Sequence, residues 1–325
     1  MGGDFAPRNV VAGAVEALRS SRNNFRVVFV GSEDRIRGEL ARHDVDGLPY
    51  DIVHAPEVVG MDDIPTVAIK QKKRSSIAVG VLLHKERKVD SFVSAGNTGA
   101  VMSAATLILG RLEGVGRPTI GAFLPSEKGV CLLLDAGTNV DCKPHHLLEF
   151  AIMGTIYQSY MYQHPNPTVG LLSIGEESTK GNDLTLHAHR LLSKSKLNFV
   201  GNVEGRDILK GKANVVVCDG FVGNVVLKFA ESVLSLLRAR VREYAAKDFF
   251  RKLWVGMMYG TLKKVLKDFD YQEYGGVPLL GVNGVSIIGH GGSTPRAIKN
   301  MILKAEEIVR KDINRHIQQA LVAHG

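Results

Sequence analysis

With 325 residues, 45% hydrophobic residues and 35 glycines, the chain can bury the core of one large α/β domain or of two lobes that share a sheet. Its three cysteines, Cys131, Cys142 and Cys218, show neither metal-ligand spacing nor a disulfide framework, which indicates a reducing cytoplasm. We expect a soluble protein, because the start lacks the regions of a signal peptide and no apolar run reaches the roughly 20 residues that span a bilayer.

The positive charge of the chain is unevenly distributed. The whole chain has a net charge of +8, and the segment from Arg238 to Lys267 holds nine Lys or Arg residues against Glu243 and Asp248. This concentration of charge indicates an acidic partner or an anionic surface rather than general basicity.

Predicted strands and helices alternate along the chain. After a turn at 2–7, we expect a helix at 9–19, a strand at 25–30, a helix from about residue 33 and a short strand at 51–54. Strand–loop–helix units follow, with strands at 91–93, 130–134, 168–172, 198–200, 215–217 and 285–288 and helices at 100–109, 145–160, 184–192, 225–237 and 295–317. This alternation predicts an α/β fold, with a largely parallel sheet and helices on both faces, in one domain spanning 1–325. A basic amphipathic helical segment, about 228–270, is expected to protrude from it.

The stretch from Val215 to Asn224 shows the recurring unit most clearly. A run of valines ends in Cys218 and Asp219, and two glycines and an amide then lead into a long helical pattern. A strand that turns sharply into a helix directs N–H groups and the positive helix end beyond the strand. Because ligands bind beyond the carboxyl ends of parallel strands, we expect these loops to form an active-site cleft, with an anion or oxyanion site at this turn.

Seven motifs identify a family that the chain resembles. They are Met1–Asp4, Ser94–Ala100, Ile174–Glu177, Lys180–Gly181, Asn202–Asp207, Cys218–Asn224 and Tyr274–Gly284. Together, over essentially the whole chain, they resemble the acyl-ACP:phosphate acyltransferases of bacterial phospholipid synthesis. The resemblance implies that inorganic phosphate attacks the thioester of a long-chain acyl-ACP, which yields acyl phosphate and free ACP.

The resemblance also implies a fold similar to that of the isocitrate and isopropylmalate dehydrogenases and of phosphate acetyltransferase. It implies a cytoplasmic homodimer without metal or organic cofactor, attached peripherally to the inner face of the cell membrane. The expected partners are acyl-ACP, inorganic phosphate, an anionic membrane surface and the downstream glycerol-3-phosphate acyltransferase, with no nucleic acid.

Two features depart from the family pattern. Family members usually begin several residues earlier, with a strand that leads into the turn at Gly2 and Gly3, so we expect either a misplaced start or a missing edge of the sheet. A histidine typically follows the aspartate of that turn, but Phe5 stands there, and we assign it no catalytic role.

Lys180 and Asn224 are the expected catalytic pair. Attack by phosphate needs donors that hold the phosphate and stabilise the oxyanion that forms at the thioester carbon. Lys180 lies in a glycine-flanked loop after a strand, where it is either a solvated lysine or a ligand of phosphate or of the oxyanion. Asn224 lies at a helix start, where it caps the helix, donates to the thioester oxygen, or does both.

Other polar residues of these loops are expected to bind substrate, to orient the catalytic pair or simply to cap helices. The segment Lys70–Arg74 also fits an exposed basic helix face, and a glycine loop such as Gly96–Gly99 is needed for many tight turns. No metal site is expected, because phosphate attack on a thioester does not require one. The expected substrate-binding residues are Asp4, Lys73, Ser75, Ser76, Asn97, Thr98, Gly99, Asp135, Asn139, Glu176, Glu177, Asp219, Gly223 and His290.

Two residues of reactive types are assigned mainly structural roles. Cys218 follows three valines, and we expect a small buried hydrophobic residue rather than an acylated nucleophile. His290 lies in the last glycine-rich loop. A thiolate whose conjugate acid has a pKa of about 8.5 leaves without strong acid catalysis, so a structural role for this histidine is preferred.

The basic segment also carries an apolar stripe. The stripe contains Leu253, Trp254, Met257, Met258, Leu262, Val265, Leu266 and Phe269. Such a pattern is typical of a core or dimer-interface helix, and it also fits insertion into a membrane surface or docking of acidic ACP. The residues expected to serve ACP and membrane are Arg251, Lys252, Trp254, Met257, Met258, Lys263, Lys264 and Lys267.

Three rival functions stay open at this point. They are a phosphate acetyltransferase-like enzyme that uses acyl-CoA, a dehydrogenase of similar fold and a non-catalytic membrane scaffold. The dehydrogenase would need acidic metal ligands and a nicotinamide site, which we do not find in the sequence. The scaffold would keep its activity after the loss of Lys180.

Overall fold

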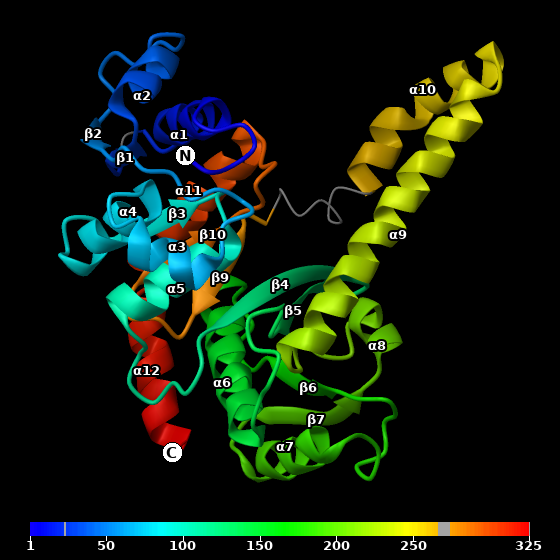
Figure 1. Ribbon diagram of the computed structural model, residues 1–325. Helices are drawn as coiled ribbons and strands as arrows, with labels where there is room; N and C mark the ends of the chain where they lie inside the picture. The colour runs from blue at the N-terminus through cyan, green and yellow to red at the C-terminus, as the bar shows by residue number, and fades with distance from the viewer. Residues whose placement is uncertain (23, 266–273, 325) are drawn as a thin grey trace.

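The computed structural model describes residues 1–22, 24–265 and 274–324 of the chain (Figure 1). Its larger sheet has eight strands in the order β3-β10-β9-β4-β5-β8-β6-β7. Their bounds are β3 (Ser91–Ser94), β4 (Thr119–Ser126), β5 (Gly129–Leu134), β6 (Thr168–Leu172), β7 (Asn198–Val203), β8 (Val215–Val217), β9 (Val277–Leu280) and β10 (Val285–Ile288). Antiparallel ladders join β10 to β9, β9 to β4 and β4 to β5, and the other ladders are parallel. The predicted α/β fold with a mostly parallel sheet is confirmed, although β4 and β9 were not predicted.

The centre of the sheet is formed by aliphatic runs that are buried on both faces. Leu132–Leu134 have no exposed surface, and Val215–Val217 expose at most 1%. Alternate side chains of these strands pack under α6 (Pro144–Met161) on one face and under α8 (Gly205–Lys210) on the other. Continuous hydrophobic runs are what strands covered by helices on both faces require.

The remaining α-helices of the body pack around the larger sheet and a second, two-stranded sheet. They are α1 (Arg8–Ser20), α2 (Glu33–Leu40), α3 (Pro65–Gln71), α4 (Ser76–Lys85), α5 (Thr98–Ala104), α7 (Asp183–Lys194), α11 (Pro295–Arg310) and α12 (Ile313–His324). The helix predicted at 295–317 is therefore two helices. Between them Asp312 has a φ of +49°, a left-handed conformation that interrupts the helix.

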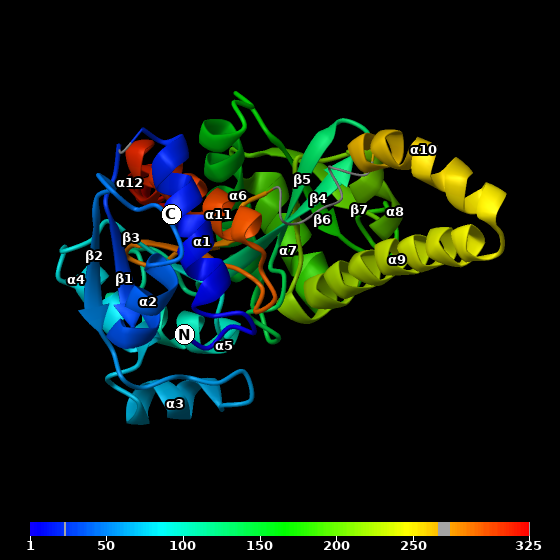
Figure 2. The ribbon, with the colours of Figure 1, turned by 90° about the horizontal axis from the view of Figure 1, so that it is seen from above.

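A helical hairpin projects from this body (Figures 1 and 2). It consists of α9 (Gly220–Ala246) and α10 (Phe249–Val265), so the expected helix and basic segment meet at a break after Ala246. The buried residues of α9 are Gly220 and Gly223, both in its first turn. By length and composition alone α9 is sufficient to cross a membrane, contrary to our expectation that no apolar run is long enough.

A separate two-stranded parallel sheet consists of β1 (Val27–Gly31) and β2 (Tyr50–His54). A largely apolar cavity of about 560 Å³ lies between β1 and β3, the end strand of the larger sheet. Met1 lines this cavity; its amino group donates to Ser76 Oγ at 3.3 Å, and burial lowers the pKa of that amino group to about 6. The N-terminal turn, β1 and β3 thus line the same cavity.

Candidate active site

Three loops leave the sheet next to one another, after β5, β8 and β6. Leu134 of β5 and Leu171 of β6 both pair with Val217 of β8 in parallel ladders, so the carboxyl ends of the three strands are nearly level. We call residues 135–139, 173–182 and 218–224 the three-loop site. It contains both predicted catalytic residues, because Lys180 follows β6 and Asn224 follows β8.

The carboxylate of Asp135 shapes the first loop of this site. It is fully buried and accepts hydrogen bonds from the backbone N–H groups of Gly137, Thr138 and Asn139 and from the side-chain amide of Asn139, at 2.7–3.2 Å. Burial raises the pKa of the Asp135 carboxyl, while donors from Thr138 and Asn139 act in the opposite direction. Asn139 is also buried and donates to Pro118 O at 2.8 Å. Asp135 and Asn139 therefore support the site from beneath.

The first turn of α9 packs closely on this loop through two glycines. Gly220 donates its N–H to Asn139 O at 2.7 Å, and a Cβ atom on Gly223 would clash with the carbonyl oxygen of the first loop residue. Asp219 is the N-cap and accepts the N–H of Val222 at 2.9 Å. The N–H groups of Gly220, Val222 and Gly223 all bond within the protein. Contrary to our expectation, these three groups are not offered to an anion.

Asn224 lies one turn into α9 rather than at its start. The prediction that Asn224 caps the helix is wrong, because Asp219 occupies the N-cap position. The side chain of Asn224 lies over Gly137: a Cβ atom added to Gly137 would lie 3.3 Å from both Cβ and Cγ of Asn224. No hydrogen bond joins the Asn224 amide to another described residue. This amide can therefore donate to a ligand above the first loop.

Lys180 lies on a turn whose backbone is held on both sides. Its N–H donates to Glu177 O at 3.0 Å, and its carbonyl accepts from Ser173 Oγ at 3.2 Å. Gly181 follows with a φ of +122°, which favours glycine. The side chain of Lys180 is exposed and forms no ion pair with another described residue. Its ammonium group is thus available to an anion.

Glu176 and Glu177 lie just before Lys180, yet neither forms an ion pair with it in the described structure. Glu176 pairs with Lys212 at 2.9 Å, and the hydrogen bond from this pairing is the main reason that the pKa of Lys212 is raised. Glu177 contributes its backbone carbonyl to the turn. Both residues anchor the loop. No direct contact in the described structure supports the expectation that their carboxylates orient Lys180.

Asp4 and His290 belong to a second group of predicted residues, around the N-terminal turn. The N–H of Asp4 donates to Gly291 O at 3.0 Å, which brings Asp4 beside the last glycine-rich loop. Within that loop, Gly292 donates its N–H to Nδ1 of His290 at 3.1 Å. The His290 side chain is exposed, and this contact fits the structural role that we preferred for it.

Most other residues of this second group make structural contacts. Asn97 caps α5 through Oδ1, and its Nδ2 donates to the carbonyl groups of residues 60, 61 and 63. Ser75 caps α4 and is fully buried, and a Cβ atom on Gly99 would lie 2.6 Å from Pro65 Cγ. The two residues of this group that remain exposed besides Asp4 and His290 are Lys73 and Thr98.

The strands that carry the two groups run in opposite directions within the sheet. Three antiparallel ladders separate β3 and β10 from β5, β8 and β6. The loops that we expected to form one cleft therefore fall into two groups, the three-loop site and the loops around the N-terminal turn. In Figure 2, α5 and the first turn of α9 nevertheless lie on the same side of the molecule, toward the bottom of that view.

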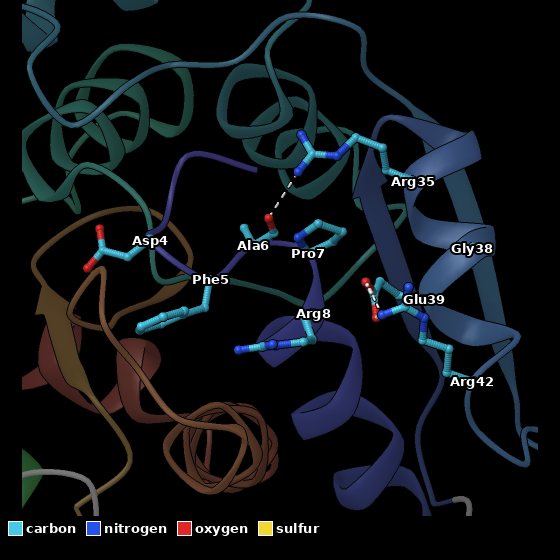
Figure 3. A pocket seen from close by; sticks show the side chains of 9 residues that line it. All are labelled: Asp4, Phe5, Ala6, Pro7, Arg8, Arg35, Gly38, Glu39 and Arg42. Atoms are coloured by element: carbon cyan, nitrogen blue, oxygen red, sulfur yellow. Dashed lines mark hydrogen bonds and ion pairs between the residues drawn. The ribbon is translucent and has the colours of Figure 1, made fainter.

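Asp4 also lines an open pocket of about 540 Å³ between the N-terminal turn and α2 (Figure 3). Arg35 donates to Ala6 O at 3.1 Å within it, and Arg42 forms an ion pair with Glu39 at 3.3 Å. The described lining consists of Asp4, Phe5, Ala6, Pro7, Arg8, Arg35, Gly38, Glu39 and Arg42. Of the predicted substrate-binding residues this lining includes Asp4 alone, so the pocket is separate from the three-loop site.

The cysteine thiols are poorly suited to nucleophilic catalysis. Cys218 is 3% exposed, and its Sγ lies 3.8 Å from the carbonyl oxygen of Asp135. Burial raises the pKa of the Cys218 thiol well above its usual range and raises those of Cys131 and Cys142 to about 12. The prediction of a buried, hydrophobic Cys218 is confirmed. Within the residues that the structure describes, no group of three or more His, Cys, Asp or Glu side chains could hold a metal ion.

The residues predicted to serve ACP and membrane lie on α10 or outside the described side chains. Trp254, Met257 and Met258 expose 62%, 67% and 43% of their surface. Arg251 pairs with Asp248 at 2.9 Å, and Lys252 is exposed. The side chains of Lys263 and Lys264, and the whole of Lys267, lie outside the described residues.

Comparisons with known proteins fit this architecture. A family model described as a fatty acid synthesis protein matches residues 1–316. The chain is 49% identical over 321 residues to a phosphate acyltransferase of Pelotomaculum thermopropionicum, which covers 99% of this chain and 93% of the relative. It is 47% identical over 330 residues to a phosphate acyltransferase of Chlorobaculum parvum, and the alignment covers 99% of this chain and 97% of that relative. The fold is similar to the EutD phosphotransacetylase from Staphylococcus aureus, with a TM-score of 0.54 and 14% identity over 95% of this chain and 99% of that one. A phosphotransacetylase from Streptococcus pyogenes gives a TM-score of 0.53 and 17% identity over 97% and 99%.

Proposed function

Since the chain belongs to the fatty acid synthesis protein family and is an acyltransferase like its phosphate acyltransferase relatives, we propose that it transfers a long-chain acyl group from acyl-ACP to inorganic phosphate. A phosphate oxygen attacks the thioester carbonyl carbon and forms a C–O bond. The C–S bond then breaks, and the thiolate leaves on ACP. The products are acyl phosphate and free ACP, and the acyl phosphate enters phospholipid synthesis.

The observation that carries this proposal is the placement of two available donors on the segments that follow two adjacent strands, β6 and β8. The ammonium group of Lys180 and the amide of Asn224 both lack a partner among the described residues, and both follow strands that end at one edge of the sheet. Lys180 binds the phosphate or the developing oxyanion through its charge. Asn224 donates to the thioester oxygen, whose negative charge grows during attack.

Direct attack by phosphate is favoured over an acyl-cysteine intermediate. A thiolate is the reactive form of cysteine, and burial opposes its formation at Cys218. The polar side chains of Lys180 and Asn224 are instead suited to bind inorganic phosphate, which is itself the nucleophile. Holding phosphate beside the thioester converts a reaction between two dissolved molecules into one within a complex.

We extend the proposal to a homodimer bound to an anionic membrane on the cytoplasmic side. The exposed apolar side chains of α9 recur every three or four residues, and those of α10 include Trp254 and Met257. Exposed apolar surface of this extent calls for a partner. The residues of the α9 stripe are Phe221, Val225, Phe229, Val233, Leu236, Leu237, Val241 and Tyr244, with exposed fractions of 40–69%. Membrane contact would also pass the lipophilic product to the glycerol-3-phosphate acyltransferase that we expect downstream.

The test of the donor compares palmitoyl-ACP with palmitoyl-CoA at equal concentration, with and without inorganic phosphate. Thiol release and acyl phosphate formation are both measured. The proposal predicts phosphate-dependent release from palmitoyl-ACP at a kcat/KM at least about tenfold above that for palmitoyl-CoA, the margin that about 1.4 kcal/mol of differential binding provides. A preference for palmitoyl-CoA would instead identify an acyl-CoA enzyme.

A further inference from the structure

The segment from Asn202 to Asp207 is polar and partly buried, and the proposed reaction uses none of its residues. Asn202 is the most buried polar residue of this segment, with 2% of its surface exposed. It lies near the end of β7, next to the loop that carries Lys180, because β7 pairs with β6. The segment therefore lies where it can act on that loop.

The side chain of Asn202 holds the carbonyl group on which the Lys180 turn closes. Its Nδ2 donates to Glu177 O at 2.9 Å, and the same oxygen accepts the N–H of Lys180 at 3.0 Å. One carbonyl thus receives both the turn's own hydrogen bond and the bond from β7. A carbonyl oxygen has two lone pairs, so both bonds form together.

His189 of α7 fixes which way the Asn202 amide points. Nδ1 of His189 lies 2.9 Å from Oδ1 of Asn202. Because Glu177 O accepts only hydrogen bonds, the NH₂ group of Asn202 must face it, and Oδ1 must face the histidine. The histidine therefore carries its proton on Nδ1 and donates it. Phe199 packs against the imidazole at a ring-centroid distance of 5.1 Å.

A second hold acts on the residue before Glu177. Lys212 pairs with Glu176 at 2.9 Å and lies 3.8 Å from Asp207, whose carboxylate also accepts the N–H of Glu204 at 3.0 Å. The loop is thus tied to the Asn202–Asp207 segment at two consecutive residues. Both ties lie within four residues of Lys180.

We propose that Asn202 is a positioning residue, which holds the Lys180 turn through Glu177 O and so keeps the ammonium group where phosphate binds. The role of Asn202 in phosphate binding rests on the proposed role of Lys180, whereas the hydrogen bond from Asn202 to Glu177 O does not. Without the bond from Asn202, the carbonyl of Glu177 loses a partner and the turn opens more often. Phosphate affinity then falls, while the acyl-ACP surface is unchanged.

The test uses Asn202→Asp, which keeps the size of the side chain and the contact with His189 but places an oxygen against Glu177 O. The matched control is Asn198→Asp on the same strand, because Asn198 Nδ2 also donates to a carbonyl, Asn166 O at 3.2 Å, away from the loop. Because a change at the buried Asn202 threatens folding, Lys212→Gln provides a second variant. It replaces a partly exposed side chain and removes the ion pairs of Lys212 with Glu176 and Asp207.

The first measurement is tryptic cleavage of the native protein after Lys180, followed by mass spectrometry, with cleavage after Lys194 as internal reference. Loss of one partly buried hydrogen bond predicts cleavage about tenfold faster for Asn202→Asp. We expect a smaller increase for Lys212→Gln and no change for Asn198→Asp. This readout does not depend on activity. Unchanged cleavage in both variants would overturn the hold on the loop.

The second measurement is steady-state kinetics with palmitoyl-ACP and phosphate. A positioning role predicts a KM for phosphate raised about tenfold in Asn202→Asp, with the KM for palmitoyl-ACP unchanged. A merely structural role lowers kcat through loss of folded enzyme and leaves both KM values as in wild type, which would overturn the proposal. If the wild-type protein makes no acyl phosphate, the proposed function is wrong. The cleavage assay still tests whether Asn202 restrains the Lys180 turn, because it does not depend on activity.

Discussion

Asn224 and Gly137 lie in direct contact across the junction of α9 and the β5 loop, so closely that a Cβ atom on Gly137 would stand 3.3 Å from Cβ and Cγ of Asn224. Gly137 also has a φ of +136°, a conformation that side chains rarely adopt. The amide that we place at the thioester oxygen therefore depends on the glycine beneath it. Asp135 in turn holds that glycine through its buried carboxylate.

Gly137→Ala should reduce turnover through Asn224. The added methyl group pushes the Asn224 side chain away from the site, and we expect kcat/KM to fall about tenfold, or roughly 1.4 kcal/mol of transition-state stabilisation. The control is Gly129→Ala, because Gly129 has a similar φ of +112° and nothing within 4 Å of its Cβ position. Both variants should lose about 1–3 kcal/mol of unfolding free energy from backbone strain. Equal activity of the two variants would contradict the contact's role.

Gly223→Ala should damage folding itself. Its methyl group would overlap the carbonyl oxygen of Asp135, so either α9 or the β5 loop must move. We expect a loss of about 3 kcal/mol or more in unfolding free energy, measured by urea denaturation. The control is Gly256→Ala on α10, because a Cβ atom at Gly256 would have nothing within 4 Å. Helix propensity predicts that this variant gains up to about 1 kcal/mol of unfolding free energy. A well-folded Gly223→Ala protein would show that the junction is looser than described.

Cys218→Ala should keep the catalytic reaction. Direct attack by phosphate predicts a kcat within about twofold of wild type, with about 1–2 kcal/mol lost from stability because a buried sulfur leaves a small cavity. The measurement is acyl phosphate formation at a temperature where the variant stays folded. Loss of turnover in a folded variant, together with a trapped acyl-enzyme in wild type, would establish the covalent route instead.

Substitution on α10 should weaken membrane binding. Trp254→Ser combined with Met257→Ser removes two side chains that are more than 60% exposed. Burial of that surface in lipid is worth about 2–4 kcal/mol, so flotation with anionic vesicles should fall at least about tenfold. Leu209→Ser on α8 removes a similarly exposed apolar side chain, 48% exposed, from the body of the protein and should leave flotation unchanged. Equal flotation of wild type, the double variant and Leu209→Ser would show that these α10 side chains do not bind the membrane.

The parallel part of the fold is predictable from the sequence because its signal is local. Val215–Val217 and the other buried runs end in glycine-containing loops, and each loop precedes a helical pattern. The strands β4 and β9 carry prolines or glycines and pair antiparallel, and their partners are set by tertiary contacts. For the same reason the opposite direction of β3 and β10 was not foreseen.

The candidate site shows the same division between local and distant contacts. Lys180 and Asn224 were predicted from segments that follow strands, and in the structure they follow the adjacent strands β6 and β8. Asp219 rather than Asn224 occupies the N-cap position, because the helix begins five residues earlier than its apolar pattern suggests. The bond from Asn202 to Glu177 spans 25 residues and depends on side-chain orientation, so no spacing in the sequence points to it.

The most direct test of the central claim is acyl phosphate formation from palmitoyl-ACP and inorganic phosphate by wild type, Lys180→Ala and Lys194→Ala. Lys194 is an exposed lysine at the end of α7, outside the three-loop site. The account predicts product with wild type and with Lys194→Ala at similar rates, and a loss of about 100-fold or more with Lys180→Ala while its unfolding midpoint is unchanged. Wild-type turnover by Lys180→Ala would contradict the account.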